Sequence, residues 1–258
     1  MCGNSNIAPP TAIRFRNVND DPSLQPEIQY RINDKLYNDT DVNLWELRAS
    51  RRALANIKNL LFGQPMLDLV QAQCEQGDAY YRSLLDASDG QWRECRTDMH
   101  VPGLKVGDIT STRQRWLEMK HDEMHRSKLL PMHPEHYTVP PHMNGEEGIV
   151  EVIGEHMARL RIVATTPNDV PEFVMAYGDP SYSFKKPTIC KLMDGTPAFY
   201  ILHEFRNNDD GCDLRLRLIF PAKAPQVFFD EHAEHLAIEF RTGVRLVLED
   251  IRKQGLSI

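Results

Sequence analysis

The sequence predicts an α+β fold in which a curved antiparallel sheet wraps around one long C-terminal helix, an arrangement called a helix grip. Three observations predict it. Apolar residues recur at helical spacing early in the chain, strand-like segments dominate after residue 148, and a long amphipathic segment ends the chain. A helix grip encloses a cavity between sheet and helix, where a ligand would bind.

The N-terminal part is predicted to be helical after a polar start. Residues 1–40 are rich in Pro, Asn and Asp, which favours a wrapping arm over a packed core. Apolar residues recur at helical spacing over 43–61, and Gly63-Gln-Pro65 ends that helix. We expect two further short helices, over 66–74 and 79–85.

The next segments mix helix and strand. We expect a strand over 92–100 and a helix over 109–130, followed by a loop rich in histidine. Short turn clusters such as NNDDG then separate strand-like segments, which is typical of an antiparallel meander. These segments are 149–164, 172–176, 188–193, 198–206 and 213–220.

The last element is a predicted helix over 225–254. It has Pro near its start, Gly after its end and one apolar stripe, formed by Phe228, Leu236, Phe240, Val244, Val247 and Ile251. We therefore predict two domains: residues 1–90 form a helical N-terminal arm or subdomain, and residues 91–258 form the helix-grip domain. Residues 1–90 would cap the cavity or make the subunit contact of a homodimer.

Composition narrows the possible partners and the compartment. The formal charge of -7 and the pI of about 5.8 argue against general attraction to nucleic acid or to anionic lipid. No run of about 18 apolar residues occurs. The five cysteines are scattered and never form C-x-x-C, which favours reduced thiols. We expect a cytoplasmic protein that binds a small molecule.

The stretch DEHAEHLAIEF (230–240) carries a candidate half of a metal site. On a helix, His232, His235 and Glu239 lie on one face, beside the apolar stripe. A buried, unpaired His and Glu would cost several kcal/mol, and a divalent cation would neutralise that charge. Imidazole nitrogen and carboxylate oxygen both suit zinc. The alternative is an ordinary solvated helix face.

Other candidate ligands lie upstream. Half of the ten histidines fall between residues 121 and 142, a density that suits either a metal site or a plain surface loop. Strand alternation places Glu151, Ile153 and Glu155 on one face, which lines the cavity or faces water. His203, on an apolar strand, is either a hydrogen-bonded core histidine or a catalytic group. The five clustered histidines are His121, His125, His133, His136 and His142.

Several motifs resemble the family of 2,4-diacetylphloroglucinol hydrolase and phloretin hydrolase. In the family's order they are VPGL (101–104), WLEMKHDEMHRSKLLPMHPEH (116–136), VEVIGEHMARLRI (150–162), LHEFRNNDDGCDLRLRLIF (202–220) and HLAIEF (235–240). The resemblance implies a helix-grip (START-like) fold. It also implies a zinc-dependent enzyme that cleaves the carbon–carbon bond between an acyl group and a phenolic ring.

The resemblance also implies roles for individual residues. The positions that match the family's zinc ligands are His136, Glu151, His235 and Glu239. His203 falls where the family has a histidine implicated in catalysis, and we expect it to act as the acid. Glu155 or His232 would support it.

The substrate-binding side departs from the family. The predicted substrate contacts are Arg126, Ser127 and Trp116, but the family has a tyrosine where this chain has Ser127. Only Trp116 remains of a tryptophan-rich stretch, and the loop between His136 and Glu151 is shorter. We therefore expect the metal site to persist with a changed aromatic or polyketide-like substrate.

Three functions fit these expectations. The first is a zinc-dependent hydrolase, using zinc or another first-row divalent ion, that cleaves a C–C bond between an acyl group and a phenolic or enolisable carbon. The second is a metal-dependent cyclase or isomerase of secondary metabolism. The third is a carrier of small molecules without catalytic activity, since the cavity alone would suffice for binding.

Overall fold

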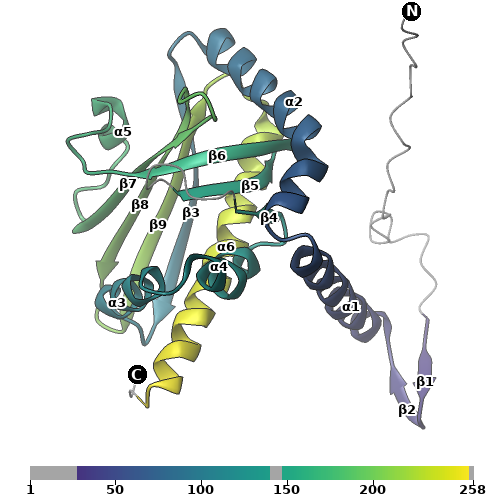
Figure 1. The fold of residues 1–258 in the computed structure, drawn as a ribbon. Helices are drawn as coiled ribbons and strands as arrows, with labels where there is room; N and C mark the ends of the chain where they lie inside the picture. Colours follow the sequence, from purple (N-terminus) through teal and green to yellow (C-terminus); the bar gives the residue numbers. More distant parts are fainter. Residues whose placement is uncertain (1–27, 140–146, 256–258) are drawn as a thin grey trace, which may run out of the picture. The chain divides into compact units, whose positions relative to one another are not determined.

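The computed structural model describes residues 28–139 and 147–255, and the chain divides into two units, residues 1–52 and 53–258 (Figure 1). Residues 1–27 of the predicted N-terminal arm therefore lie outside the described residues. In the first unit, β1 (Tyr30–Ile32) and β2 (Lys35–Tyr37) form an antiparallel hairpin. α1 (Asp39–Leu60) follows, in agreement with the predicted helix over 43–61.

The second unit contains a seven-stranded antiparallel sheet with the strand order β3-β9-β8-β7-β6-β5-β4. Consecutive strands from β4 to β9 pair with one another, which is the predicted meander, and β3 pairs with β9 along its whole length. The strands are β3 (Trp92–Pro102), β4 (His136–Thr138), β5 (Glu147–Ile153), β6 (His156–Ala164), β7 (Phe184–Lys191), β8 (Pro197–Asn207) and β9 (Gly211–Pro221).

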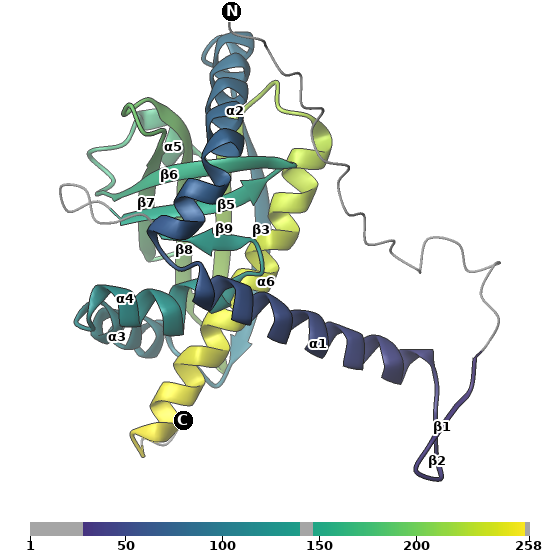
Figure 2. The same cartoon turned by 45° about the vertical axis from the view of Figure 1, so that its right-hand side comes forward.

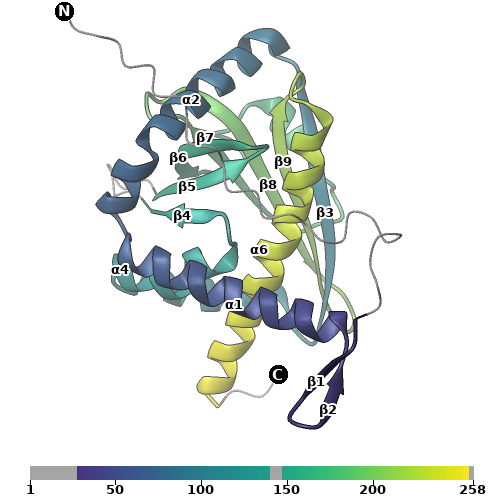
Figure 3. The same cartoon turned by 90° about the vertical axis from the view of Figure 1, so that its right-hand side faces the viewer.

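The long helix α6 (Gln226–Lys253) crosses one face of this sheet, as Figure 3 shows. α6 contacts both β3, at one edge of the sheet, and β5, near the other edge. One helix can reach both ends only because the sheet curls around it. The buried stripe of α6 packs into the main core together with Phe199 and Phe220. The helix-grip fold predicted from sequence is thus confirmed.

α2 (Gln64–Ser88) is one continuous helix that packs against β6 (Figure 2). The two short helices expected at 66–74 and 79–85 are a wrong prediction, because Gly77 between them is an interior helical residue. A Cβ atom at Gly77 would collide with the carbonyl oxygen of Met157 on β6. Gly77 therefore permits close packing of helix on strand, and tertiary contact overrides its low helix propensity.

Gly77→Ala is expected to destabilise the fold by about 2 to 3 kcal/mol, because α2 must move away from β6. Gly107→Ala, in α3 (Val106–Leu117), is the matched control. A Cβ there meets no atom within 4 Å, so alanine should stabilise the helix by up to about 1 kcal/mol. Urea denaturation measures both variants; equal effects would contradict the close packing.

The prediction of a single helix over 109–130 is wrong. α3 ends at Leu117, and α4 (His121–Met124), the π-helical turn η2 (His125–Leu129) and the 3-10 turn η3 (Leu130–Met132) follow. The break lets two donors from different segments reach one carboxylate of α6. Trp116 Nε1 and Lys128 Nζ both bond to Asp250 Oδ2, at 2.7 and 2.5 Å.

Two other predictions need correction. Residues 172–176 form the helix α5 (Glu172–Ala176) instead of a strand, and Val174 is buried on the outer face of the sheet. Residues 149–164 are two strands joined by a tight turn at Gly154 and Glu155, both of which have positive φ. Glu155 therefore does not share a strand face with Glu151, because it lies in the turn.

The described residues contain free cysteines and no membrane-spanning helix. Among the described residues, four cysteines are free and buried. None of their helices combines the length and the apolar character needed to cross a membrane.

Candidate metal centre

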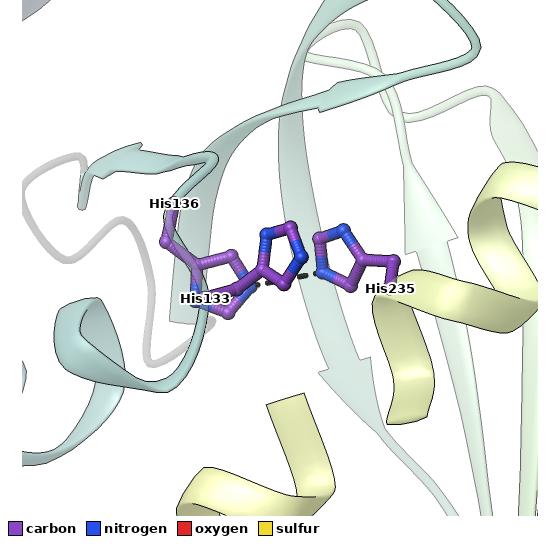
Figure 4. A group of neighbouring side chains, drawn as sticks. All are labelled: His133, His136 and His235. Atoms are coloured by element: carbon purple, nitrogen blue, oxygen red, sulfur yellow. Dashed lines mark hydrogen bonds between the residues drawn. The ribbon is translucent and has the colours of Figure 1, made fainter. Parts of the chain in front are cut away.

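Three separate elements bring histidine and glutamate side chains together inside the second unit. His133 follows η3, and His136 begins β4. Strand pairing sets His136 directly opposite Glu151 of β5. The fourth group, His235, reaches the same place from α6, and Figure 4 shows the three imidazole rings directed toward one another.

The distances among His136, Glu151 and His235 fit a shared cation. The two Nε2 atoms lie 3.2 Å apart. Glu151 Oε2 lies 3.5 Å from His136 Nε2 and 3.7 Å from His235 Nε2. Zinc bonds of about 2.0 to 2.2 Å in a tetrahedron require ligand atoms about 3.3 to 3.6 Å apart. The triangle therefore has the size of one face of a tetrahedral site.

The tautomer of His136 suits metal binding. Its Nδ1 lies 3.0 Å from the carbonyl oxygen of Leu129 and must donate a proton to it. In the neutral ring the lone pair is then on Nε2, which faces His235 and Glu151. This outer hydrogen bond is the usual way in which a protein orients a ligating imidazole.

His133 is a fourth donor close to the triangle. Ring nitrogens of His133, His136 and His235 lie within 4.8 Å of one another, and all three residues are buried. The His133 ring stacks on that of His235, with centroids 3.6 Å apart. Its Nε2 is buried without a hydrogen-bond partner, as is Nδ1 of His235. The backbone N–H of Glu135 donates to Nδ1 of His133 at 3.1 Å, so in the neutral ring the proton is on Nε2. His133 could therefore bind a cation only by giving up this hydrogen bond or by moving the ring proton.

Burial keeps these imidazoles neutral. It lowers the pKa of His133 to about 4 and that of His136 to about 3, and it also lowers the pKa of His235. At neutral pH each ring therefore has one nitrogen with a lone pair, the form that binds a metal, and in His133 this nitrogen is Nδ1, which accepts the N–H of Glu135.

Burial raises the pKa values of two carboxyl groups nearby. Burial and the neighbouring charge of Glu239 raise the pKa of Glu151 to about 8. Burial raises the pKa of Glu239 to about 7, one helical turn after His235. Both carboxyl groups thus lack a positive partner of sufficient strength. The structure brings Glu239 near Glu151, while the close triangle is formed by the other three predicted ligands.

The two predicted catalytic residues lie in different surroundings. His203 on β8 packs edge-on against Phe240, and its Nδ1 is buried without a hydrogen-bond partner. Burial lowers the pKa of His203 to about 3, so the ring is neutral at pH 7 and holds no proton beyond its single N–H. Glu155 is exposed in the β5–β6 turn. His232, expected to support catalysis, is buried and stacks parallel to His235.

The three predicted substrate contacts do not line the pocket beside the histidines. Arg126 is exposed, lies over the Phe62 ring and donates to a backbone carbonyl. Ser127 donates to the carbonyl of Glu123, and Trp116 is buried with its indole nitrogen bonded to Asp250.

The other histidines of the sequence cluster separate into groups. His121 and His125 pair with each other, with ring centroids 4.0 Å apart. His142 lies outside the described residues. The sequence signal for His133 was its place in MHPEH, since His133 and His136 are three residues apart between prolines, but the predicted ligand set did not include it.

A pocket of about 470 Å³ adjoins the candidate metal centre. Its wall includes His133, His232 and His235, the β5–β6 turn and the first half of α6. A small molecule in this pocket would therefore lie next to any ion held by the histidines.

Lys58 fastens the histidine segment to the end of α1. Its Nζ donates to the carbonyl oxygens of Pro134 and His133, at 2.6 and 3.3 Å, and burial lowers its pKa to about 8. Lys58→Met should keep the aliphatic stem but release this segment, and we expect zinc affinity to fall about tenfold.

The chain offers a matched control for Lys58. Lys105 Nζ also donates to two carbonyl oxygens, those of Asn208 and Asp209 at the β8–β9 turn. Lys105→Met should therefore leave zinc affinity unchanged. Competition with a chromophoric chelator measures both variants, and equal losses would show that Lys58 has no specific role in positioning the histidines.

The sequence matches no family model and no curated protein. Among solved structures, it is similar to the crystal structure of Ara h 8.0201, with a TM-score of 0.39 and 12% identity. That similarity covers 62% of this chain and 99% of the other.

Proposed function

We propose that this protein is a metal-dependent hydrolase that cleaves a C–C bond between an acyl group and a phenolic or enolisable carbon, with zinc as the metal. The observation that carries the proposal is the triangle of His136, Glu151 and His235, whose edges of 3.2 to 3.7 Å match a tetrahedral zinc site. The motifs that resemble the phloroglucinol hydrolase family support the same residues.

The residues present fit a catalytic metal. His136, Glu151 and His235 would hold the ion, with His133 or Glu239 as the nearest further donors. Such an ion would polarise a carbonyl and acidify a water molecule. Three protein ligands beside a pocket are typical of catalytic zinc, whereas structural zinc is closed by four.

His203 is the proposed proton carrier of the reaction. The pKa of His203 is lowered to about 3, so the ring is neutral and would take up the proton released when water adds to the acyl carbonyl only as negative charge develops on the substrate. It would then donate that proton to the leaving carbon, which a phenolic or β-diketone substrate stabilises through its keto tautomer. His203 would thus act first as a base and then as the acid.

Metal analysis and labelling test this function together. Protein purified without chelator should contain about one zinc per chain, lose hydrolysis of acyl-phenols on chelation and regain it with Zn²⁺. In ¹⁸O-water the released carboxylate should carry the label. Turnover without label would favour a cyclase or isomerase. A protein without stoichiometric metal or turnover would favour a carrier, which the pocket alone could serve.

A further inference from the structure

The pocket beside the histidines has an acidic wall. Four glutamates line it: Glu135, Glu155, Glu231 and Glu234. They come from three places in the chain, namely the segment before β4, the β5–β6 turn and the first half of α6. None of the residues that line the pocket is Lys or Arg. The pocket therefore presents negative charge from several sides.

No cationic side chain neutralises these four carboxylates by a direct ion pair within the described ranges. Within the described ranges, none of them forms an ion pair. The ammonium of Lys58 acts on Glu135 from a distance but is bonded to two carbonyl oxygens. Glu135 and Glu231 both line the pocket, so these two carboxyl groups face a common space.

A second feature of the wall points to a ligand. His133 lines the pocket and is 4% exposed, and its Nδ1 accepts the backbone N–H of Glu135, so its buried Nε2 carries the ring proton without an acceptor among the described residues. Such a donor suits the carbonyl oxygen of an acyl group. The wall also has an apolar part, which includes Val152, Ile153 and Ile238. An inorganic ion gains nothing from an apolar wall, whereas an organic cation gains from both the wall and the carboxylates.

We propose that this pocket recognises a substrate that carries a cationic group, such as an amine or a quaternary ammonium, joined to an apolar body. The inference deepens the proposed function, because it names the substrate class of the same site. The acyl group would face the histidines, and the cation would face the carboxylates of Glu135 and Glu231. An anionic substrate would be repelled.

Binding of benzyltrimethylammonium tests the inference without any turnover. This probe has a permanent charge and no donor atom for zinc. Calorimetry on the zinc-loaded full chain should give an affinity about tenfold above that of benzyl alcohol, and benzenesulfonate should bind more weakly than either. The Glu135→Gln, Glu231→Gln double variant should lose that tenfold preference. Glu249→Gln, on an exposed part of α6, should retain it.

The wild-type protein supplies a second measurement, independent of any variant. Raising the salt concentration from 0.02 to 0.5 M should weaken binding of the cation severalfold and leave benzyl alcohol unaffected. Equal affinities for the three probes would overturn the inference. So would Ca²⁺ binding that depends on Glu135 and Glu231 while the organic cation does not bind, because the pocket would then hold an inorganic ion.

Failure of the proposed function is distinguishable from failure of this inference. The calorimetry is repeated on metal-free protein. If the cation binds there but zinc does not bind to the chain, the pocket's preference stands and the hydrolase is rejected. If zinc binds in stoichiometric amount but the cation shows no preference, the hydrolase stands and the cationic substrate is rejected.

Discussion

Replacement of His235 by alanine is expected to weaken zinc binding more than about a hundredfold and to abolish hydrolysis. His235 Nε2 forms two edges of the ligand triangle, at 3.2 Å to His136 and 3.7 Å to Glu151. Its loss leaves only two donors of the triangle, and zinc needs at least three protein ligands. Because changes in the outer shell alone cost tenfold to a hundredfold, loss of a ligand should exceed that range.

The measurement is a zinc titration against a chromophoric chelator, with circular dichroism as the check of folding. His100→Ala is the control, since His100 is a half-exposed histidine on β3 that pairs with Asp213. It should retain both zinc and activity. Stoichiometric, tight zinc in the His235→Ala protein would reject the centre, whatever the activity.

A second pair of variants tests whether Glu151 or His133 is the third zinc ligand. Glu151→Gln should lose zinc nearly as completely as His235→Ala, because Glu151 Oε2 completes the tetrahedral face. His133→Gln should lower zinc affinity only about tenfold, because the His133 ring stacks face to face on His235 and is not one of the three corners of the triangle. The reverse order would make His133 the ligand and Glu151 a neighbour.

Much of the fold could be predicted from periodicity, because the relevant residues obey local rules. The stripe of α6 and the turn clusters between β7, β8 and β9 are signals of this kind. The misread elements depend on distant contacts. Gly77 lies between the two helices predicted over 66–74 and 79–85, but it is interior to α2, where β6 packs closely against it. The β5–β6 turn was missed because Glu155 occupies a left-handed position where Gly or Asn is usual.

The candidate site also combines residues that local patterns reveal with residues that only distant contacts bring together. His235 and Glu239 could be found from helical spacing, but strand β4, which pairs His136 with Glu151, has only three residues and no alternation to reveal it. His133 and Lys58 meet across 75 positions of sequence, which no local pattern encodes. The buried setting of His203 likewise depends on packing against Phe240.

Zinc affinity is expected to fall steeply between pH 8 and pH 5, by about tenfold per pH unit below 8 and about a hundredfold per unit below 7. The metal binds deprotonated carboxylates, and the pKa of Glu151 is raised to about 8 and that of Glu239 to about 7. Below pH 8 zinc must therefore displace one proton, and below pH 7 a second.

The imidazoles should add nothing to this slope above pH 4, since the pKa values of His133 and His136 are lowered to about 4 and 3. A site of solvated histidines would behave differently, because its affinity would be flat down to about pH 6.5. Chelator competition from pH 5 to 9 separates the two cases. Glu151→Gln and Glu239→Gln should each remove one proton from the slope, and an unchanged slope in Glu239→Gln would place that carboxylate outside the metal centre.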